Sequence, residues 1–247
     1  LRNAETRQSL SISEVLIRCK ERSTELPVLV LEKTNNDRSG NVIWTTQKGA
    51  GSAFEENGDP SEKLKSLLAK NLRVFLPDLM GQGQWAGQSG KVSGQRLTND
   101  KRSYSAFTYG YNRTLAAERC SDLLTVIAAA SRDEQDELPI LLLGDQGSAA
   151  WSVPAAAIAG SQVDQAILVT NGFRYEQIRD FKDPNFVPGA VKYGDIPALI
   201  ALRAPHSTVV IGEDATIPLV QETYQAVESA KQLMVADSLR LESLMIP

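Results

Sequence analysis

The 247-residue sequence has the size of one large α/β domain or two small ones, and its 42% hydrophobic and 23% charged residues are typical of a globular protein. The sequence has 26 Lys and Arg residues and 30 Asp and Glu residues, which gives a net charge of −4. It therefore lacks the excess of basic residues that is typical of nucleic-acid-binding proteins. No apolar run approaches the roughly 20 residues of a membrane span.

Cysteine and histidine are scarce in this sequence. Cys19 and Cys120 are too few for a disulfide scaffold or a cysteine-based zinc site, and the sequence leaves open whether they pair. His206 is the single histidine, so a mechanism that needs an imidazole from this chain must use that residue. The sequence begins at Leu1 rather than Met, and we expect it to be part of a longer protein.

Residues 1–25 are predicted to form an N-terminal helical segment. Ser11 precedes Glu14 by three residues, which is the spacing of a capping box at the start of a helix. Two β-rich stretches follow at 26–33 and 41–47, with a polar turn between them. This pattern predicts an antiparallel pair of strands at a sheet edge.

The rest of the chain alternates strands and helices. The predicted strands are 73–78, 138–143, 163–170, 208–211 and 233–236, and the predicted helices are 61–71, 115–132, 148–159, 197–203 and 217–231; a Gly-, Gln- and Ser-rich loop takes up 81–105. Such alternation favours right-handed crossovers and a mainly parallel sheet with helices on both faces. We therefore expect residues 26–247 to form a single α/β domain, a three-layer sandwich whose twisted, mostly parallel sheet has an antiparallel edge.

Gly-rich turns at the carboxyl ends of the strands are the candidate ligand sites, because open α/β sheets bind ligands there. The turn at 49–54 carries two glycines of the dinucleotide fingerprint, but Phe54 stands at the third position. No long helix opens directly after it, so a pyrophosphate would lack a helix N-terminus. We do not favour a dinucleotide site.

The turn after the strand at 138–143 indicates a nucleophile elbow. A buried strand, the turn Gly144-Asp-Gln-Gly147 and a helix of small residues supply the strand–turn–helix context of that motif. The motif reads Gly-x-Ser-x-Gly, whereas here Gln146 stands at the nucleophile position and Ser148 at the second glycine.

Several segments, in the order of the fold, resemble bacterial α/β-hydrolases of the acetyl xylan esterase group. They are 74–83, 107–112 with 119–122, the elbow with 155–160, and 189–195 with Ala204-Pro205. The resemblance spans roughly residues 26–235. It implies a serine nucleophile at the elbow, an acid after a late strand and a histidine after the last strand.

Carried over to this sequence, the resemblance places the acid at Asp214 and the nucleophile at Gln146, and no histidine follows Asp214. A glutamine amide is not a nucleophile, and losing one triad member removes most of the rate. Ser148 would need a base to react, and it fits a helix N-cap better. His206 precedes the strand at 208–211 and is expected at the opposite, amino end of the sheet.

Other polar and aromatic side chains are candidates for the cleft. As oxyanion or cleft residues the sequence offers Gln47, Lys48, Gly147, Asp78, Asp145 and Tyr111. The carboxylates Asp78, Asp145, Asp195 and Asp214 could perform acid–base chemistry or hold a cation, although capping of turns and helices explains them better. The aromatic residues that could form a sugar platform, or pack the long loop, are Trp44, Trp85, Tyr104, Phe107, Tyr109 and Tyr111.

We therefore predict a pseudoenzyme with the α/β-hydrolase fold, related to carbohydrate acetyl esterases and carrying a degenerate nucleophile elbow. Its cleft would bind a saccharide, an acetylated carbohydrate or another domain of a longer chain, without a cofactor or a metal. One alternative is an active ester hydrolase with an unconventional site or with residues supplied from outside this chain. Another is an interaction domain whose cleft is filled by side chains. The resemblance alone suggests a secreted or periplasmic location.

Overall fold

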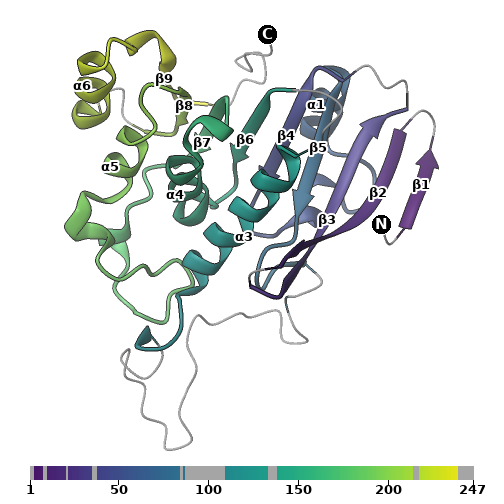
Figure 1. Ribbon diagram of the computed structural model, residues 1–247, viewed down its shortest axis with the longest axis horizontal. Helices are drawn as coiled ribbons and strands as arrows, with labels where there is room; N and C mark the ends of the chain where they lie inside the picture. Colours follow the sequence, from purple (N-terminus) through teal and green to yellow (C-terminus); the bar gives the residue numbers. More distant parts are fainter. Residues whose placement is uncertain are drawn as a thin grey trace, which may run out of the picture.

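The computed structural model describes residues 3–7, 10–20, 22–34, 38–83, 86, 109–132, 138–213 and 217–238. These residues form a nine-stranded sheet with helices on both faces (Figure 1). The prediction of an α/β sandwich, with a mostly parallel sheet and an antiparallel edge, is confirmed.

The strands of the described residues are β1 (Asn3–Arg7), β2 (Leu10–Cys19), β3 (Thr24–Lys33), β4 (Gly40–Thr45), β5 (Leu72–Pro77), β6 (Ile140–Gly144), β7 (Gln165–Val169), β8 (Ser207–Ile211) and β9 (Leu233–Ala236). The α-helices are α1 (Glu62–Ala69), α3 (Leu115–Ala130), α4 (Ala149–Ala159), α5 (Asp195–Ala201) and α6 (Pro218–Ala226). Short 3-10 turns are η1 (Ala50–Ala53), η3 (Gly160–Gln162), η4 (Tyr175–Gln177), η5 (Ala190–Tyr193) and η6 (Ala230–Gln232).

The strand order is β1-β2-β3-β5-β4-β6-β7-β8-β9. Strands β1, β2, β3 and β5 pair antiparallel in turn, and β5, β4, β6, β7, β8 and β9 pair parallel. From β4 the chain moves to β5 on one side and then to β6 on the other. The carboxyl ends of β4 and β6 therefore form the topological switch point, where open α/β sheets bind ligands.

The N-terminal prediction is wrong, because strands β1 and β2 occupy the region where a helix was expected. Strand β2 pairs with β3 over its whole length, from Leu10 opposite Lys33 to Cys19 opposite Thr24. Its apolar side chains alternate between the two faces: Leu10 and Ile12 pack in one hydrophobic cluster, and Val15 and Ile17 in the other. The period of two prevails over the capping-box spacing.

Strands β3 and β4 do not form the antiparallel pair that was predicted. Strand β5 lies between them, antiparallel to β3 and parallel to β4. All six residues of β4 are buried. A strand that is covered on both faces belongs in the interior of the sheet, with neighbours on both sides, and not at its edge.

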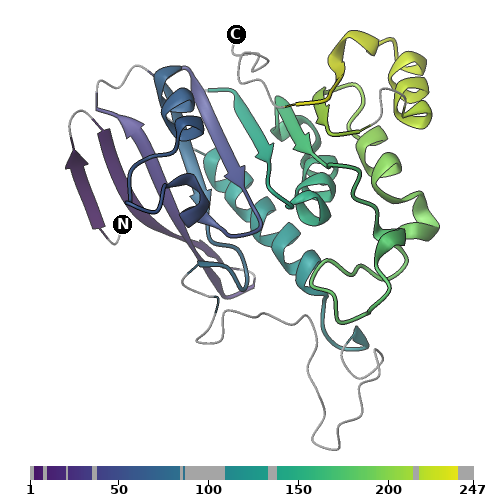
Figure 2. The ribbon, with the colours of Figure 1, turned by 180° about the vertical axis from the view of Figure 1, so that it is seen from behind.

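Two hydrophobic clusters fill the layers of the sandwich. One lies between the sheet and the helices α3, α4, α5 and α6, and the other lies between the sheet and α1 with η1. Figure 2 shows α1 on the face opposite the other helices. Both cysteines are free, Cys120 being buried and Cys19 half-buried. Within the described residues, no helix combines the length and hydropathy of a membrane span.

Candidate functional site

The turn between β6 and α4, residues 144–148, is a sharp strand-to-helix bend. A Cβ atom on Gly144 would lie 2.3 Å from Ser152 Oγ, so only glycine lets the strand and the helix approach this closely. At the apex Gln146 has a φ of 45° and Gly147 a φ of 78°. A left-handed backbone at a non-glycine residue is strained, and such strain is common at functional sites.

The bend lies at the switch point of the sheet and is joined to the loop that follows β4. Asp145 N donates to Thr45 O at 2.9 Å, and Gln47 N donates to Gln146 O at 3.1 Å. The elbow predicted from the sequence therefore sits at the carboxyl edge of the sheet, where an active site of this topology would be expected.

Neither residue at the predicted nucleophile positions presents a reactive oxygen. Gln146 is exposed, but its side chain ends in an amide. Ser148 is completely buried, and its Oγ lies 3.4 Å from Ser152 Oγ. It occupies the N-cap position of α4, as predicted, although its hydroxyl does not accept a hydrogen bond from the helix.

The oxyanion candidates Gln47, Lys48 and Gly147 gather beside the bend. Gln47 N donates to Gln146 O, and Lys48 N donates to Thr46 Oγ1 at 3.3 Å, so both amides are engaged within the protein. The side-chain Oε1 of Gln47 lies against Gly147, 3.1 Å from the position a Cβ atom would take there. Gln47 thus covers part of the space beside the apex.

Asp145 is buried and its carboxylate is fully used by its neighbours. One oxygen accepts the N–H of Gln146 at 2.8 Å, and the other forms an ion pair with Lys63 of α1. The Lys63 ammonium also lies 5.6 Å from the centre of the Trp44 ring. These contacts hold the turn and leave Asp145 in the role of a turn-stabilising group.

Asp78 serves the neighbouring loop in the same way. Its Oδ1 accepts Ala50 N at 2.8 Å, and the nearby Gln82 Nε2 donates to Thr46 O at 2.8 Å and to Gln47 O at 3.0 Å. Asp78 follows β5 and Asp145 follows β6, and these two strands are not neighbours, because β4 lies between them.

The acid expected after the late strand β8 is Asp214, which lies outside the described residues. Its neighbour Glu213 is buried and accepts two hydrogen bonds from Arg174, at 2.7 and 2.6 Å, and another from Thr170. Burial alone would raise the pKa of Glu213, but the hydrogen bonds from Arg174 and Thr170 bring that pKa below its ordinary value. The carboxylate is therefore held ionised in a closed ion pair.

His206 lies at the amino end of the sheet, as the sequence predicts. Val210 pairs with Leu168, which pairs with Gly144 of the bend, and His206 comes four residues before Val210. Four strand residues span about 13 Å, beyond the reach of a direct or water-mediated proton transfer. Burial and the nearby charge of Arg203 lower the pKa of His206.

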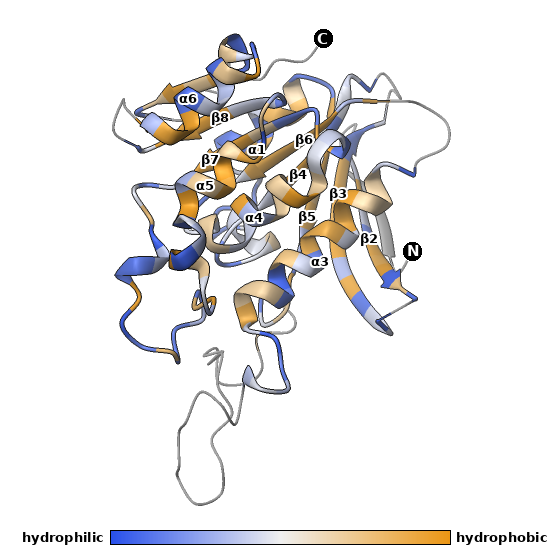
Figure 3. Ribbon diagram, turned by 60° about the vertical axis from the view of Figure 1, so that its left-hand side comes forward, coloured by the Kyte–Doolittle hydropathy of each residue, from blue (hydrophilic) through white to orange (hydrophobic). Residues whose placement is uncertain are grey.

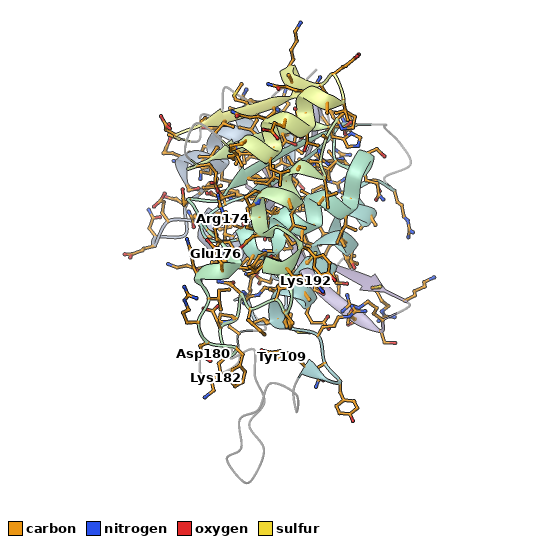
Figure 4. All side chains as sticks on the ribbon, turned by 90° about the vertical axis from the view of Figure 1, so that its left-hand side faces the viewer. Tyr109, Arg174, Glu176, Asp180, Lys182 and Lys192 are labelled. Carbon is orange, nitrogen blue, oxygen red and sulfur yellow. The ribbon has the colours of Figure 1, made fainter. Side chains whose placement is uncertain are left out.

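The aromatic candidates do not form a platform at the bend. Trp44 is buried beneath it, and Tyr111 is 93% exposed before α3. Tyr109 packs the loop after β7, since its hydroxyl donates to Phe181 O at 2.6 Å. Figure 4 shows Tyr109 beside Asp180 and Lys182, below Arg174 and Glu176. Trp85, Tyr104 and Phe107 lie outside the described residues.

The described residues offer no group of three or more His, Cys, Asp or Glu side chains that could hold a metal. The last acidic candidate, Asp195, accepts the N–H groups of Tyr175 and Ile196 at 2.9 and 2.7 Å and that of Glu176 at 3.0 Å. The glycine turn at 49–54 forms only the short η1, so a dinucleotide has no helix N-terminus there.

Solved structures share the fold of this chain, although no family model and no curated protein matches the sequence. A protein from Bacteroides fragilis NCTC 9343, provisionally assigned as an acetyl xylan esterase, has a TM-score of 0.68 and 14% identity over 96% of this chain and 68% of its own. Acetyl xylan esterase 1 from Thermoanaerobacterium sp. JW/SL YS485 has a TM-score of 0.54 and 13% identity over 96% of this chain and 80% of its own. A Klebsiella pneumoniae protein, provisionally assigned as a dienelactone hydrolase, has a TM-score of 0.55 and 13% identity over 94% of this chain and 86% of its own.

The chain has the α/β-hydrolase fold. The bend at 144–148 joins a parallel strand of the sheet to a helix, which is the strand–turn–helix context in which a nucleophile elbow occurs. Two ion pairs near the bend and after β8 could not be predicted from the sequence: Lys63 with Asp145, and Arg174 with Glu213. In each pair the partners come from different elements, and neither carries a local sequence signal.

Proposed function

We propose that this α/β-hydrolase-fold protein is a pseudoenzyme related to carbohydrate acetyl esterases, which retains the elbow as architecture and acts by binding. The observation that carries the proposal is the apex itself. Gln146 keeps the left-handed backbone of an elbow while its side chain offers an amide in place of a hydroxyl. Strained backbone without reactive chemistry is what an inherited scaffold would leave.

Ester cleavage at an elbow requires a nucleophilic oxygen, a base that takes its proton and donors for the oxyanion. The amide nitrogen lone pair of Gln146 is delocalised, and Ser148 is sealed in the core. The single histidine is at the far end of the sheet, and the backbone amides of Gln47 and Lys48 donate within the protein. The described residues therefore supply neither the nucleophile nor the base, and two of the three oxyanion candidates already donate within the protein.

The ion pair between Glu213 and Arg174 supports the same proposal. In a triad the acid accepts the N–H of the histidine and orients the ring. Here a buried carboxylate after β8 is fully occupied by Arg174 and Thr170. Arg174 neutralises the buried charge of Glu213, which would otherwise be left unpaired in the interior. A catalytic site that has lost its histidine would need such a partner for its acid, because an unpaired buried charge destabilises the fold.

The ligand that we propose for the carboxyl edge is a neutral saccharide. The side chains of Gln47 and Gln146 are both exposed and belong to residues joined by a backbone hydrogen bond. A carboxamide can donate and accept at once, which matches the hydroxyl groups of a sugar. We expect xylo-oligosaccharides to bind weakly, and the double substitution Gln47→Ala with Gln146→Ala to abolish that binding in calorimetric titrations.

Turnover of 4-nitrophenyl acetate and of acetylated xylan tests the proposal. We expect wild type, Gln146→Ala and Ser148→Ala all to release product at the rate of the buffer. Gln177→Ala, which alters an exposed glutamine outside the bend, serves as the matched control. Saturable turnover by wild type that either Gln146→Ala or Ser148→Ala removes would show an active ester hydrolase and overturn the proposal.

A further inference from the structure

A cavity of about 600 Å³ opens in the layer of helices, and none of the residues 144–148 lines it. Its walls come from α3, α4, η5, α5 and the segment before η5. Alanines on facing helices, Ala116 and Ala117 of α3 and Ala150 of α4, leave the space that larger side chains would fill. The volume is within the range of small-molecule sites, about 300–1,000 Å³.

The lining of this cavity is mostly apolar. Leu124, Pro154 and Leu199 contribute to the walls, and Ile158 and Tyr193, which are 66% and 76% exposed, lie at the opening. Figure 3 shows hydrophobic residues along α3 and α5 on this side of the molecule. Large apolar side chains exposed around a concavity are typical of binding sites.

The polar groups beneath the cavity are already paired. Pro154 has no N–H, so the helix cannot satisfy Ala150 O, which accepts the Tyr175 hydroxyl at 2.7 Å instead. Burial raises the pKa of the Cys120 thiol to about 12, so this side chain stays neutral. A ligand therefore needs to form no hydrogen bond with the floor of the cavity, and an alkyl chain can pack there.

One cationic side chain, Arg113, is among the residues that line the cavity. Arg113 lines the cavity, is exposed, and has no hydrogen bond or ion pair with another described residue. Lys192 of η5 does not itself line the cavity, but its ammonium lies 5.7 Å from the centre of the ring of Tyr193, which does. No Asp or Glu is among the described residues that line the cavity.

We propose that this cavity binds an aliphatic carboxylate, with the alkyl chain between α3 and α4 and the carboxylate at Arg113. The apolar walls supply the burial that drives binding, and the Arg113 guanidinium selects the anionic head group. A neutral ligand would form no ion pair with Arg113, and a cationic one would be repelled. The site is independent of the proposed loss of ester cleavage at the elbow.

Calorimetric titration with laurate below its micellar concentration tests this proposal, with dodecanol and dodecyltrimethylammonium as neutral and cationic probes. We expect one laurate per chain and an affinity order of laurate, dodecanol, then the cationic probe. Arg113→Gln should weaken laurate about threefold, as for a partly exposed ion pair, and leave dodecanol unchanged. Arg132→Gln, at the other end of α3, is the matched control.

Two filling variants, Ala117→Trp and Ala190→Trp, should each abolish binding of both laurate and dodecanol while the thermal unfolding transition is kept. The proposal is overturned if laurate fails to bind wild type, if both folded filling variants still bind it, or if Arg113→Gln and Arg132→Gln weaken it equally. A dimer in sedimentation experiments that closes the cavity to laurate would also overturn it.

Discussion

Gln146, at the apex of the bend, holds a backbone conformation that residues other than glycine rarely adopt. A left-handed φ costs an L-residue roughly 1–2 kcal/mol, whereas glycine adopts it without this penalty. The surrounding contacts, above all Asp145 with Lys63 and the hydrogen bond from Gln47 N to Gln146 O, impose the conformation. The bend is therefore determined by its neighbours and not by its apex residue.

Substituting the apex by glycine tests this view. We expect Gln146→Gly to raise the free energy of unfolding by about 0.5–1 kcal/mol in urea denaturation, after the higher unfolded-state entropy of glycine is subtracted. Gln47 does not have a positive φ, so Gln47→Gly relieves no strain and should lower the free energy of unfolding. A loss of stability in Gln146→Gly equal to that in Gln47→Gly would show that the apex is unstrained.

Asp122 gives the structure a pH dependence of its own. Its carboxylate is buried, and burial raises its pKa to about 6 despite the hydrogen bond from Met80 N and the charges of Arg22 and Arg119. The folded protein therefore keeps a proton that the unfolded chain releases near pH 4. Stability should fall as pH rises from about 4 to about 6, because the folded state binds the extra proton.

Asp122→Asn imitates the protonated side chain and can still accept Met80 N. We expect it to match wild type at pH 4 and to be more stable by about 2–3 kcal/mol at pH 7, with the difference appearing between those values. Urea denaturation of wild type and Asp122→Asn between pH 4 and pH 7 measures this difference in stability. Asp237→Asn, at an exposed position, should follow wild type throughout; a constant gap between Asp122→Asn and wild type would contradict the assignment.

At the scale of the element, helix α4 depends on a bond from outside itself. Pro154 removes the helical donor for Ala150 O, and the Tyr175 hydroxyl replaces it. Burial raises the pKa of Tyr175 above its ordinary value, so the hydroxyl remains a donor throughout the physiological range. The segment after β7 is thereby attached to the helix that begins at the elbow.

Tyr175→Phe should lower the free energy of unfolding by about 1–3 kcal/mol, because Ala150 O is left buried without a donor. In a Pro154→Ala background the restored N–H of residue 154 should donate to Ala150 O, so Tyr175→Phe should lower the free energy of unfolding by less. A double-mutant cycle in urea measures the difference. Equal costs in the two backgrounds would show that the hydroxyl does not replace the missing helical bond.

The elements that the sequence predicts well carry local signals. Continuous apolar runs predict the strands β6, β7 and β8, and two closely spaced glycines predict the bend at 144–148. The sequence of strand β2 predicts a helix because a capping-box spacing coincides there with a period-two pattern. The position of β5 between β3 and β4 depends on contacts across the whole sheet, which carry no local sequence signal. Lys63 and Asp145 are 82 residues apart, so only the folded chain brings them together.

For the whole molecule, the topology fixes the place of a site and the residues decide its chemistry. The switch point between β4 and β6 survives with a glycine-dependent bend, a buried acid ion pair after β8 and polar side chains at the edge. Under the proposed function, fold and position would be retained without the nucleophile and the histidine. The cavity that Arg113 lines is a separate part of the same scaffold, and we propose that it binds an aliphatic carboxylate.

The most direct test of the central claim is covalent labelling with an alkyl fluorophosphonate, which reacts with the activated serine of a working elbow. We predict that the intact mass of the purified protein stays unchanged after treatment. An added phosphonyl mass that peptide mapping places on Ser148, and that Ser148→Ala abolishes, would contradict the account and identify an active serine hydrolase.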